Sequence, residues 1–360
     1  MASRRHLDHD PPGTGTSPRP AHPARPWSRR IGRFAGSAAL ALLVLLIFSA
    51  GLNAALTQHE RTSTAPYGQR VPVDGGSVNV VDDEADGPAV VLLSGLGTPA
   101  PALDFAPLGR ELTGYRVVVV EGLGYGYADR AAPERTVQNI SEEIHSALVA
   151  AGVEAPYVLG GHSLAGFYLL DYVNRYPGEV SAVVGIDTTV PAFAAERTTT
   201  TAENGRGIPW ARLAADTGLL RWAVLVAPDL ALPEDTAHTA QERDQLRRMT
   251  VWNFGNAAVA DETHRIGDNA RRLEGVQFPP DLPVLLLLAR VTVDETPGWL
   301  PAHEEQMQQV RDHEIVVLHG GHYLHRTQSP EIAARTTAFL REHGVVPRDR
   351  TTLPATATTG

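Results

Sequence analysis

Short runs of apolar residues recur along the chain between residues 70 and 318. Six of them, at residues 89–93, 115–120, 157–159, 182–186, 284–288 and 315–318, lack alternating polar positions. This pattern predicts strands that are covered on both faces. Two further runs, residues 70–73 and 77–81, flank Asp74-Gly75-Gly76 and predict a hairpin. The chain should therefore contain a sheet of eight strands.

Amphipathic helical stretches separate most of these runs, for example at residues 137–151, 164–175 and 331–342. Strands that alternate with helices predict an α/β fold with a mostly parallel sheet, right-handed crossovers and helices on both faces.

The alternation stops between residues 188 and 282, where several helices are predicted instead. One of them should begin at a capping box formed by Thr239 and Glu242. We interpret residues 188–282 as a helical cap inserted after the sixth strand. The core is then formed by residues 67–187 and 283–343.

Both ends of the chain differ from this core. Residues 1–33 are rich in Pro, Arg and Gly and predict a disordered basic segment, and the Thr-rich residues 344–360 predict a loose tail. Residues 34–58 contain no Asp, Glu, Lys, Arg or His. A helix of that length rises about 37 Å, against a hydrocarbon core of about 30 Å. We expect this segment to be a transmembrane anchor.

The charges beside the apolar segment predict its orientation. Arg29, Arg30 and Arg33 precede it, and the first acidic residue after it is Glu60. The positive-inside rule then puts the N-terminus in the cytoplasm and the core outside it. The alternative is a cleaved signal peptide and a secreted protein. For that alternative, only Ser49 with Gly51 fits a small-residue cleavage site.

Composition excludes several kinds of chemistry. The chain has a net charge of −10, and residues 1–60 carry seven arginines against three acids, so the acidity lies in the core. An acidic core argues against nucleic acid as a partner. The absence of cysteine excludes disulfides, thiolate nucleophiles and cysteine metal sites.

The strand at residues 157–159 leads into Gly160-Gly161-His162-Ser163-Leu164-Ala165-Gly166, and a helix follows at once. A serine on so sharp a turn needs small neighbours, and its hydroxyl projects above the sheet. This is the context of a nucleophile elbow, with Ser163 as the candidate nucleophile. His162 is expected to pack beside the turn.

With this elbow, residues 87–340 resemble the α/β-hydrolase family. Leu92-Leu93-Ser94-Gly95-Leu96-Gly97 is similar to the family's loop after its third strand, and Glu121-Gly122-Leu123-Gly124-Tyr125-Gly126 to its glycine-rich loop after the fourth. The resemblance implies an oxyanion hole formed by the amides of Leu96 and Leu164, with no cofactor and no metal. It implies a shaping role for Glu121.

A serine nucleophile needs a histidine as base and a carboxylate to orient that histidine. The family order is serine, acid, histidine. His322 follows the last strand and precedes Ser329-Pro330-Glu331, as in the family. Asp294 is the first carboxylate after the seventh strand and is the preferred acid. Glu295 beside it and Asp187 after the sixth strand remain alternatives.

The resemblance thus implies a serine hydrolase that forms an acyl-enzyme on Ser163 from an ester or related acyl substrate. A serine at the elbow separates the chain from the dehalogenase and epoxide hydrolase branches, whose nucleophile is aspartate. Apolar cap residues such as Trp222, Trp252 and Phe254 favour a hydrophobic substrate group. The alternative is a non-hydrolytic use of the fold, as a ligand-binding module or a cofactor-free lyase or perhydrolase.

Overall fold

The computed structural model describes residues 27–195, 208–231 and 237–348 of the chain. These residues divide into two compact units, Met1–Phe48 and Ser49–Gly360, which are described separately below. The larger unit contains the sheet and every candidate site residue.

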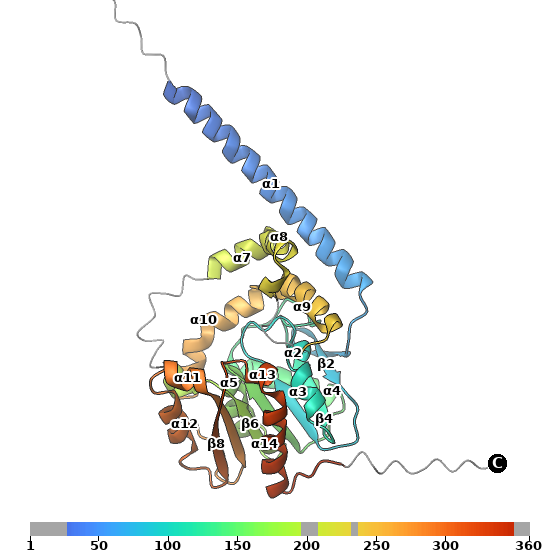
Figure 1. Ribbon diagram of the computed structural model, residues 1–360, viewed down its shortest axis with the longest axis vertical. Helices are drawn as coiled ribbons and strands as arrows, with labels where there is room; N and C mark the ends of the chain where they lie inside the picture. Colours follow the sequence, from blue (N-terminus) through green and yellow to red (C-terminus); the bar gives the residue numbers. More distant parts are fainter. Residues whose placement is uncertain (1–26, 196–207, 232–236, 349–360) are drawn as a thin grey trace, which may run out of the picture. The chain divides into compact units, whose positions relative to one another are not determined.

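The eight expected strands form one sheet, in the order β1-β2-β4-β3-β5-β6-β7-β8 (Figure 1). The strands are β1 (Gln69–Val73), β2 (Gly76–Asp82), β3 (Ala89–Leu93), β4 (Arg116–Glu121), β5 (Tyr157–His162), β6 (Val180–Ile186), β7 (Val284–Ala289) and β8 (His313–Leu318). β2 pairs antiparallel with β1 and β4, and all other neighbours are parallel. The predicted α/β class and mostly parallel sheet are confirmed.

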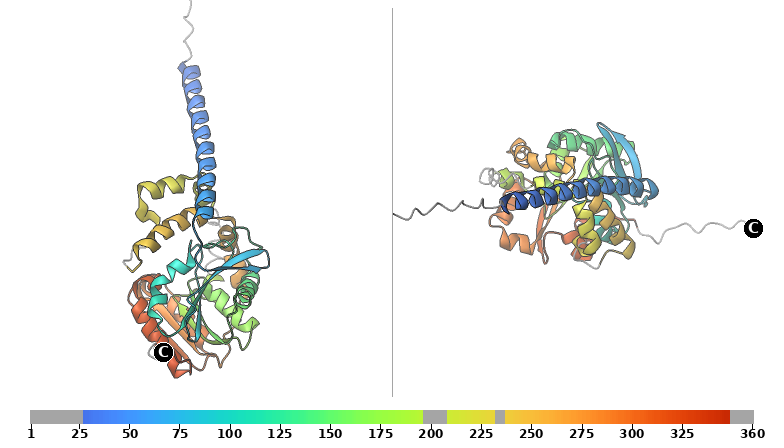
Figure 2. Two further views of the ribbon diagram at one scale, coloured as in Figure 1. Left: turned by 90° about the vertical axis from the view of Figure 1, so that its right-hand side faces the viewer. Right: turned by 90° about the horizontal axis from the view of Figure 1, so that it is seen from above.

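Helices cover both faces of this sheet (Figures 1 and 2). They are α2 (Pro101–Asp104), α3 (Ala106–Glu111), α4 (Val137–Ala150), α5 (Ala165–Arg175), α11 (Arg290–Glu295), α12 (Trp299–Met307), α13 (Leu324–Thr327) and α14 (Ser329–Glu342). Alternate residues of β3 enter different cores: Val91 packs with the residues of α4 and α5, and Val90 with those of α3 and α14. This division follows from the two-residue repeat of a strand and explains why the strands are apolar throughout.

The cap consists of α7 (Ile208–Asp216), α8 (Leu219–Val226), the 3-10 helix η1 (Pro228–Ala231), α9 (Ala240–Asn253) and α10 (Ala257–Arg272). The predicted capping box is present, because the Thr239 hydroxyl accepts from the Glu242 N–H and the Glu242 carboxylate accepts from the Thr239 N–H. The Asn253 amide donates to the carbonyls of Pro99 and Gly126, at 2.8 and 2.9 Å. The cap is thereby fixed to the loops that follow β3 and β4.

Helix α1 (Trp27–Ser63) begins seven residues before the expected anchor at residues 34–58. Residues 27–33 were expected to be disordered, and this expectation is wrong: the sequence has no proline between Pro26 and Pro66 to end a helix. The remainder of the predicted disordered segment, residues 1–26, lies outside the described residues, as do residues 349–360 of the predicted tail. Phe34–Ser63 is long and apolar enough to cross a membrane, and its most apolar 18 residues have a mean hydropathy of 2.4.

A close approach between α5 and the segment after β6 requires glycine at position 166. A Cβ there would lie 2.6 Å from the carbonyl oxygen of Thr189. Backbone atoms form this contact, so neither side can rotate away.

We therefore expect Gly166→Ala to destabilise the fold by about 1–3 kcal/mol, as overpacking does. Gly109→Ala is the matched control, because Gly109 also lies in a helix but a Cβ there would meet only Val117 Cγ1 at 3.6 Å. That control should be neutral or stabilising by up to about 1 kcal/mol, since alanine favours helix. Chemical denaturation measures both. Equal stability of the two variants would contradict the close contact.

Candidate active site

Ser163 lies at the sharp turn between β5 and α5, as the sequence predicts. Its φ of +56° is in the left-handed region, which is uncommon for residues other than glycine. The turn is held by the Ser163 N–H, which donates to the carbonyl of Ile186 at 3.2 Å, and by the Ser163 carbonyl, which accepts from the Thr189 N–H at 2.8 Å. The strained serine is therefore fixed against the end of β6.

His322, in the loop after β8, is hydrogen-bonded to Ser163: its Nε2 is 2.8 Å from Ser163 Oγ. Its Nδ1 is 2.7 Å from Asp187 Oδ2. Because a carboxylate only accepts, Nδ1 carries the proton and Nε2 accepts from the serine hydroxyl. The imidazole is 37% exposed, whereas the Asp187 carboxylate is fully buried. This arrangement can move a proton from Ser163 to His322.

Four donors converge on the carboxylate of Asp187. Oδ1 accepts from the backbone N–H of Ala289 and from Trp299 Nε1, each at 3.1 Å. Oδ2 accepts from Thr292 Oγ1 at 2.6 Å, in addition to His322. These bonds compensate for the burial of a charge and fix the direction in which the carboxylate faces.

The expectation that Asp294 is the carboxylate beside His322 is wrong. Residues 290–295 form helix α11 directly after β7. Asp294 is exposed there, and its carboxylate lies 3.4 Å from the guanidinium of Arg290, one turn earlier. Glu295 is exposed as well. The place beside His322 belongs to Asp187, the alternative after the sixth strand.

The two expected oxyanion-hole residues flank Ser163. The backbone of Gly95 passes so close that a Cβ there would lie 2.7 Å from Ser163 Cβ, which places the neighbouring Leu96 beside the nucleophile. Leu164 follows the serine and precedes the first turn of α5. Within the described part of the chain, the N–H groups of Leu96 and Leu164 have no hydrogen-bond partner. Both are therefore available to a substrate oxygen.

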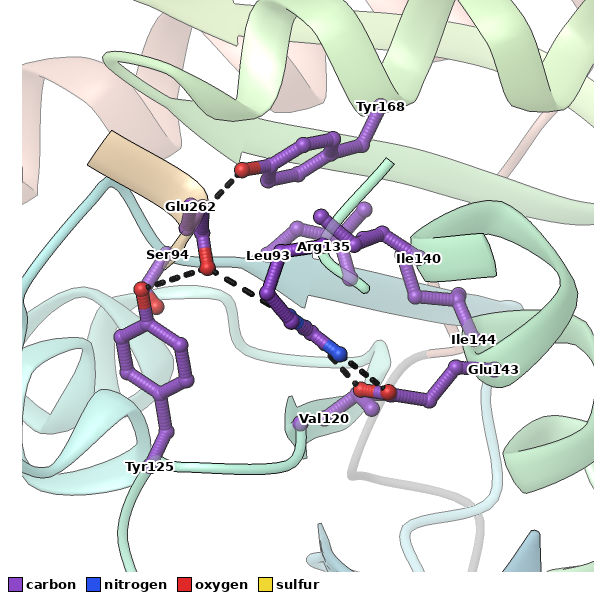
Figure 3. Close-up of a pocket in the computed structure, with 11 residues that line it drawn as sticks. Leu93, Ser94, Val120, Tyr125, Arg135, Ile140, Glu143, Ile144, Tyr168 and Glu262 are labelled. Atoms are coloured by element: carbon purple, nitrogen blue, oxygen red, sulfur yellow. Dashed lines mark hydrogen bonds and ion pairs between the residues drawn. The ribbon is translucent and has the colours of Figure 1, made fainter. Parts of the chain in front are cut away.

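A buried polar cluster supports the loop that carries Leu96 (Figure 3). The Gly97 N–H donates to Tyr125 Oη at 3.3 Å, and Tyr125 Oη donates to Glu262 Oε2 at 3.0 Å. Tyr168 also donates to Glu262, and Arg135 Nε lies 3.6 Å from it. Burial raises the pKa of Glu262, although Arg135 and the two hydroxyls act in the opposite direction. No local sequence pattern links residue 262 to residues 97 and 125, so this cluster could not be predicted from the sequence.

His162 packs beside the turn, as expected, and also holds the His322 loop. Its Nε2 donates to the His322 carbonyl at 2.9 Å. Burial lowers the pKa of His162 well below its ordinary value, and the neighbouring His325 and His322 lower it further, so the ring is neutral. His325 is itself buried and bonded to Asp104, at 2.7 Å.

Glu121 is buried at the end of β4 and holds the loops around it. Its carboxylate accepts hydrogen bonds from the Asn79 side chain and from the N–H groups of Tyr127 and Ala102.

Several known proteins resemble this chain in sequence. The protein YbdG of Bacillus subtilis is 23% identical over 76% of this chain and 86% of its own length. RutD of Escherichia coli, whose name proposes a carbamate hydrolase activity, is 36% identical over a shorter stretch, covering 29% of this chain and 38% of RutD. The chain thus matches well under half of RutD's length.

Solved structures share the fold at low identity. A laboratory-evolved variant of a potato epoxide hydrolase has a TM-score of 0.62 at 16% identity, covering 76% of this chain and 98% of the other. A membrane phospholipase A described as a bacterial virulence factor has a TM-score of 0.54 at 21% identity, covering 88% and 99%. Residues 88–325 match the family model described as the alpha/beta hydrolase fold, which is more than half of the chain. The chain belongs to the α/β-hydrolase fold family.

Proposed function

We propose that this protein is a serine hydrolase that cleaves an ester or related acyl substrate through an acyl-enzyme on Ser163. The observation that carries the proposal is the continuous series of hydrogen bonds from Ser163 Oγ through His322 to Asp187, at 2.8 and 2.7 Å. A serine hydroxyl becomes an effective nucleophile only when such a base accepts its proton. The family relationship and the hydrolase relatives support the same class of reaction.

In the first half of the reaction, Ser163 Oγ attacks the carbonyl carbon of the substrate while its proton passes to His322 Nε2. The carbonyl oxygen becomes negatively charged, and the N–H groups of Leu96 and Leu164 stabilise it. The bond to the leaving group then breaks, and His322 donates its proton to that group. The acyl group remains on Ser163.

In the second half, His322 accepts a proton from a water molecule, and the oxygen of that water attacks the acyl carbon. Collapse of the second tetrahedral intermediate releases a carboxylic acid and returns the proton to Ser163. Asp187 holds the imidazole in the tautomer that both halves need and stabilises its protonated form. The donors from Ala289, Thr292 and Trp299 keep this carboxylate directed at Nδ1.

We further propose that α1 anchors the protein in a membrane, with the N-terminus in the cytoplasm and the catalytic unit outside. The uncharged residues 34–58 and the preceding Arg29, Arg30 and Arg33 support this topology.

Apolar side chains of the cap, among them the half-exposed Phe254, support a hydrophobic acyl or alkyl group in the substrate.

The nucleophile is tested by Ser163→Ala, which should lower the turnover of p-nitrophenyl esters at least about a thousandfold and abolish labelling by a fluorophosphonate probe. Ser141→Ala is the control, because the Ser141 hydroxyl is buried without a hydrogen-bond partner in the described residues. It should retain labelling and turnover. Undiminished ester hydrolysis by purified Ser163→Ala protein would refute the proposed mechanism.

The acid is tested by comparing Asp187→Asn with Asp294→Asn. Asparagine at position 187 can donate to His322 Nδ1 and so favour the wrong tautomer, and we expect the turnover number to fall by about 10³- to 10⁴-fold. Asp294→Asn should be near wild type, because that side chain is exposed and its ion pair is with Arg290, away from His322. Circular dichroism verifies that both variants are folded. The reverse order of the two effects would assign the acid to α11.

The anchor is tested by membrane fractionation of the full-length protein. It should sediment with membranes and resist carbonate extraction, and protease added outside should reach the catalytic unit. A control with Leu43→Arg and Leu45→Arg should lose retention, because each arginine costs about 2.5–3.5 kcal/mol at the centre of a span. A soluble form that begins near residue 52 would instead identify the segment as a cleaved signal.

A further inference from the structure

The cap has an apolar surface that is exposed in the described part of the chain. Helix α8 reads Leu219-Leu220-Arg221-Trp222-Ala223-Val224-Leu225-Val226, with one charged residue in eight. A helix that is apolar on all sides is normally buried in protein or in lipid. Yet Leu225 is 70% exposed and Val226 85%, and Leu219 and Leu230 are exposed beside them. We call these four residues the cap patch.

The other side of α8 is fixed to the C-terminal part of α1. Trp222 Nε1 donates to Ser49 Oγ at 2.8 Å. In the preceding helix α7, the carbonyl of Ala215 accepts from Asn53 Nδ2 at 3.0 Å. Arg221 binds Asn53 and forms an ion pair with Glu60, at 2.6 Å. These contacts lie within the larger unit and link α8 to a defined stretch of the chain, residues 49–60.

The length of a membrane span determines how deep residues 49–60 lie in the bilayer. A helix needs about 20 apolar residues to cross the hydrocarbon core. Counted from Phe34, the first residue after Arg33, 20 residues end at Asn53. Ser49 and Asn53 would then lie in the last turns of the span, and α8, which donates to both through Trp222 and Arg221, must lie at the boundary of the bilayer. This step rests on the proposed anchor.

A groove next to the cap patch adds positive charge to the apolar surface. It encloses about 410 Å³, and its lining combines apolar side chains such as Leu225 and Val251 with Arg221, Arg247 and Arg248 and with one acid, Glu60, which pairs with Arg221. Asp244 lies 3.9 Å from Arg247 Nη1 and 2.9 Å from Arg248 Nη2, so one carboxylate is shared by two guanidinium groups. The Nε of Arg247 is buried and has no hydrogen-bond partner among the described residues. A guanidinium with an unpaired donor beside apolar side chains suits a lipid phosphate above acyl chains.

From these observations we propose that the cap patch docks onto an anionic lipid bilayer. Leu225 and Val226 enter the acyl region, Trp222 lies at the headgroup level, and Arg247 and Arg248 face lipid phosphates. An amphipathic tryptophan and flanking arginines are the usual composition of such an interface. The catalytic unit is thereby held against the membrane by two elements, α1 and α8.

The chain contains no cysteine, so single-cysteine variants test this docking directly. The full-length protein is reconstituted in phosphatidylcholine vesicles that contain phosphatidylglycerol, and each variant carries a nitroxide label. Val226→Cys reports on the cap patch. Val149→Cys on α4 is the matched control, a valine 65% exposed near the end of a helix. Leu45→Cys reports on the anchor independently.

The label at position 226 should be more accessible to lipid-soluble oxygen than to a water-soluble nickel chelate, and the label at 149 should show the opposite preference. If the label at position 226 is accessible to the nickel chelate while the label at position 45 lies in lipid, the docking is overturned and the anchor stands. Position 226 in lipid with position 45 in water would support docking and refute the anchor. Both positions in water would overturn both proposals.

Two further outcomes would also be decisive. Protection of position 226 from both reagents, with spin–spin broadening between labels, would show that a second copy of the chain covers the patch, which overturns lipid docking. The oxygen preference should fall when phosphatidylglycerol is omitted, and also in the Arg247→Gln, Arg248→Gln variant. An unchanged preference in these samples would overturn the assignment of the two arginines to lipid phosphates.

Discussion

The arrangement of the site depends on four adjacent parallel strands whose carboxyl ends lie along one edge of the sheet. Ser163 directly follows β5 and Asp187 directly follows β6. Three donors to Asp187 lie at the end of β7 or after it, and the fourth, His322, follows β8. The buried Asp187 carboxylate is the point where these segments meet, because a charge removed from water must be surrounded by donors. Each donor that satisfies it also fixes one of the loops around the site.

Local sequence signals were sufficient for much of this arrangement. The glycines around Ser163, the alternation of strands and helices, and the capping box at Thr239 each depend on residues close together in the chain, and all are present. The identity of the acid was different, because carboxylates follow both β6 and β7 and either could reach a histidine after β8. The position of Asp294 depended on whether residues 290–295 form an extended segment or a helix. They form a helix, and Asp294 pairs with Arg290 one turn away.

Contacts between the cap and the core could not be predicted in the same way. Glu262 lies 137 positions from Tyr125, and Asn253 lies 127 positions from Gly126. Such pairs are determined by the packing of α9 and α10 on the loops after β3 and β4, and each residue alone is an ordinary helical polar residue. The same holds for α8, whose apolar sequence predicts a buried helix but gives no indication that residues 49–60 cover only one of its sides.

Helix α10 therefore limits how far the cap can be treated as an interchangeable module. Glu262 on this helix holds Tyr125, which in turn accepts from the Gly97 N–H next to Leu96, and Asn256 at its start binds the Gly124 carbonyl. Substituting the cap with that of a relative would remove supports of the loop beside Ser163. Under the proposed function, substrate selectivity and rate would then be coupled by epistasis across the cap and the core, and evolution or engineering would have to alter them together.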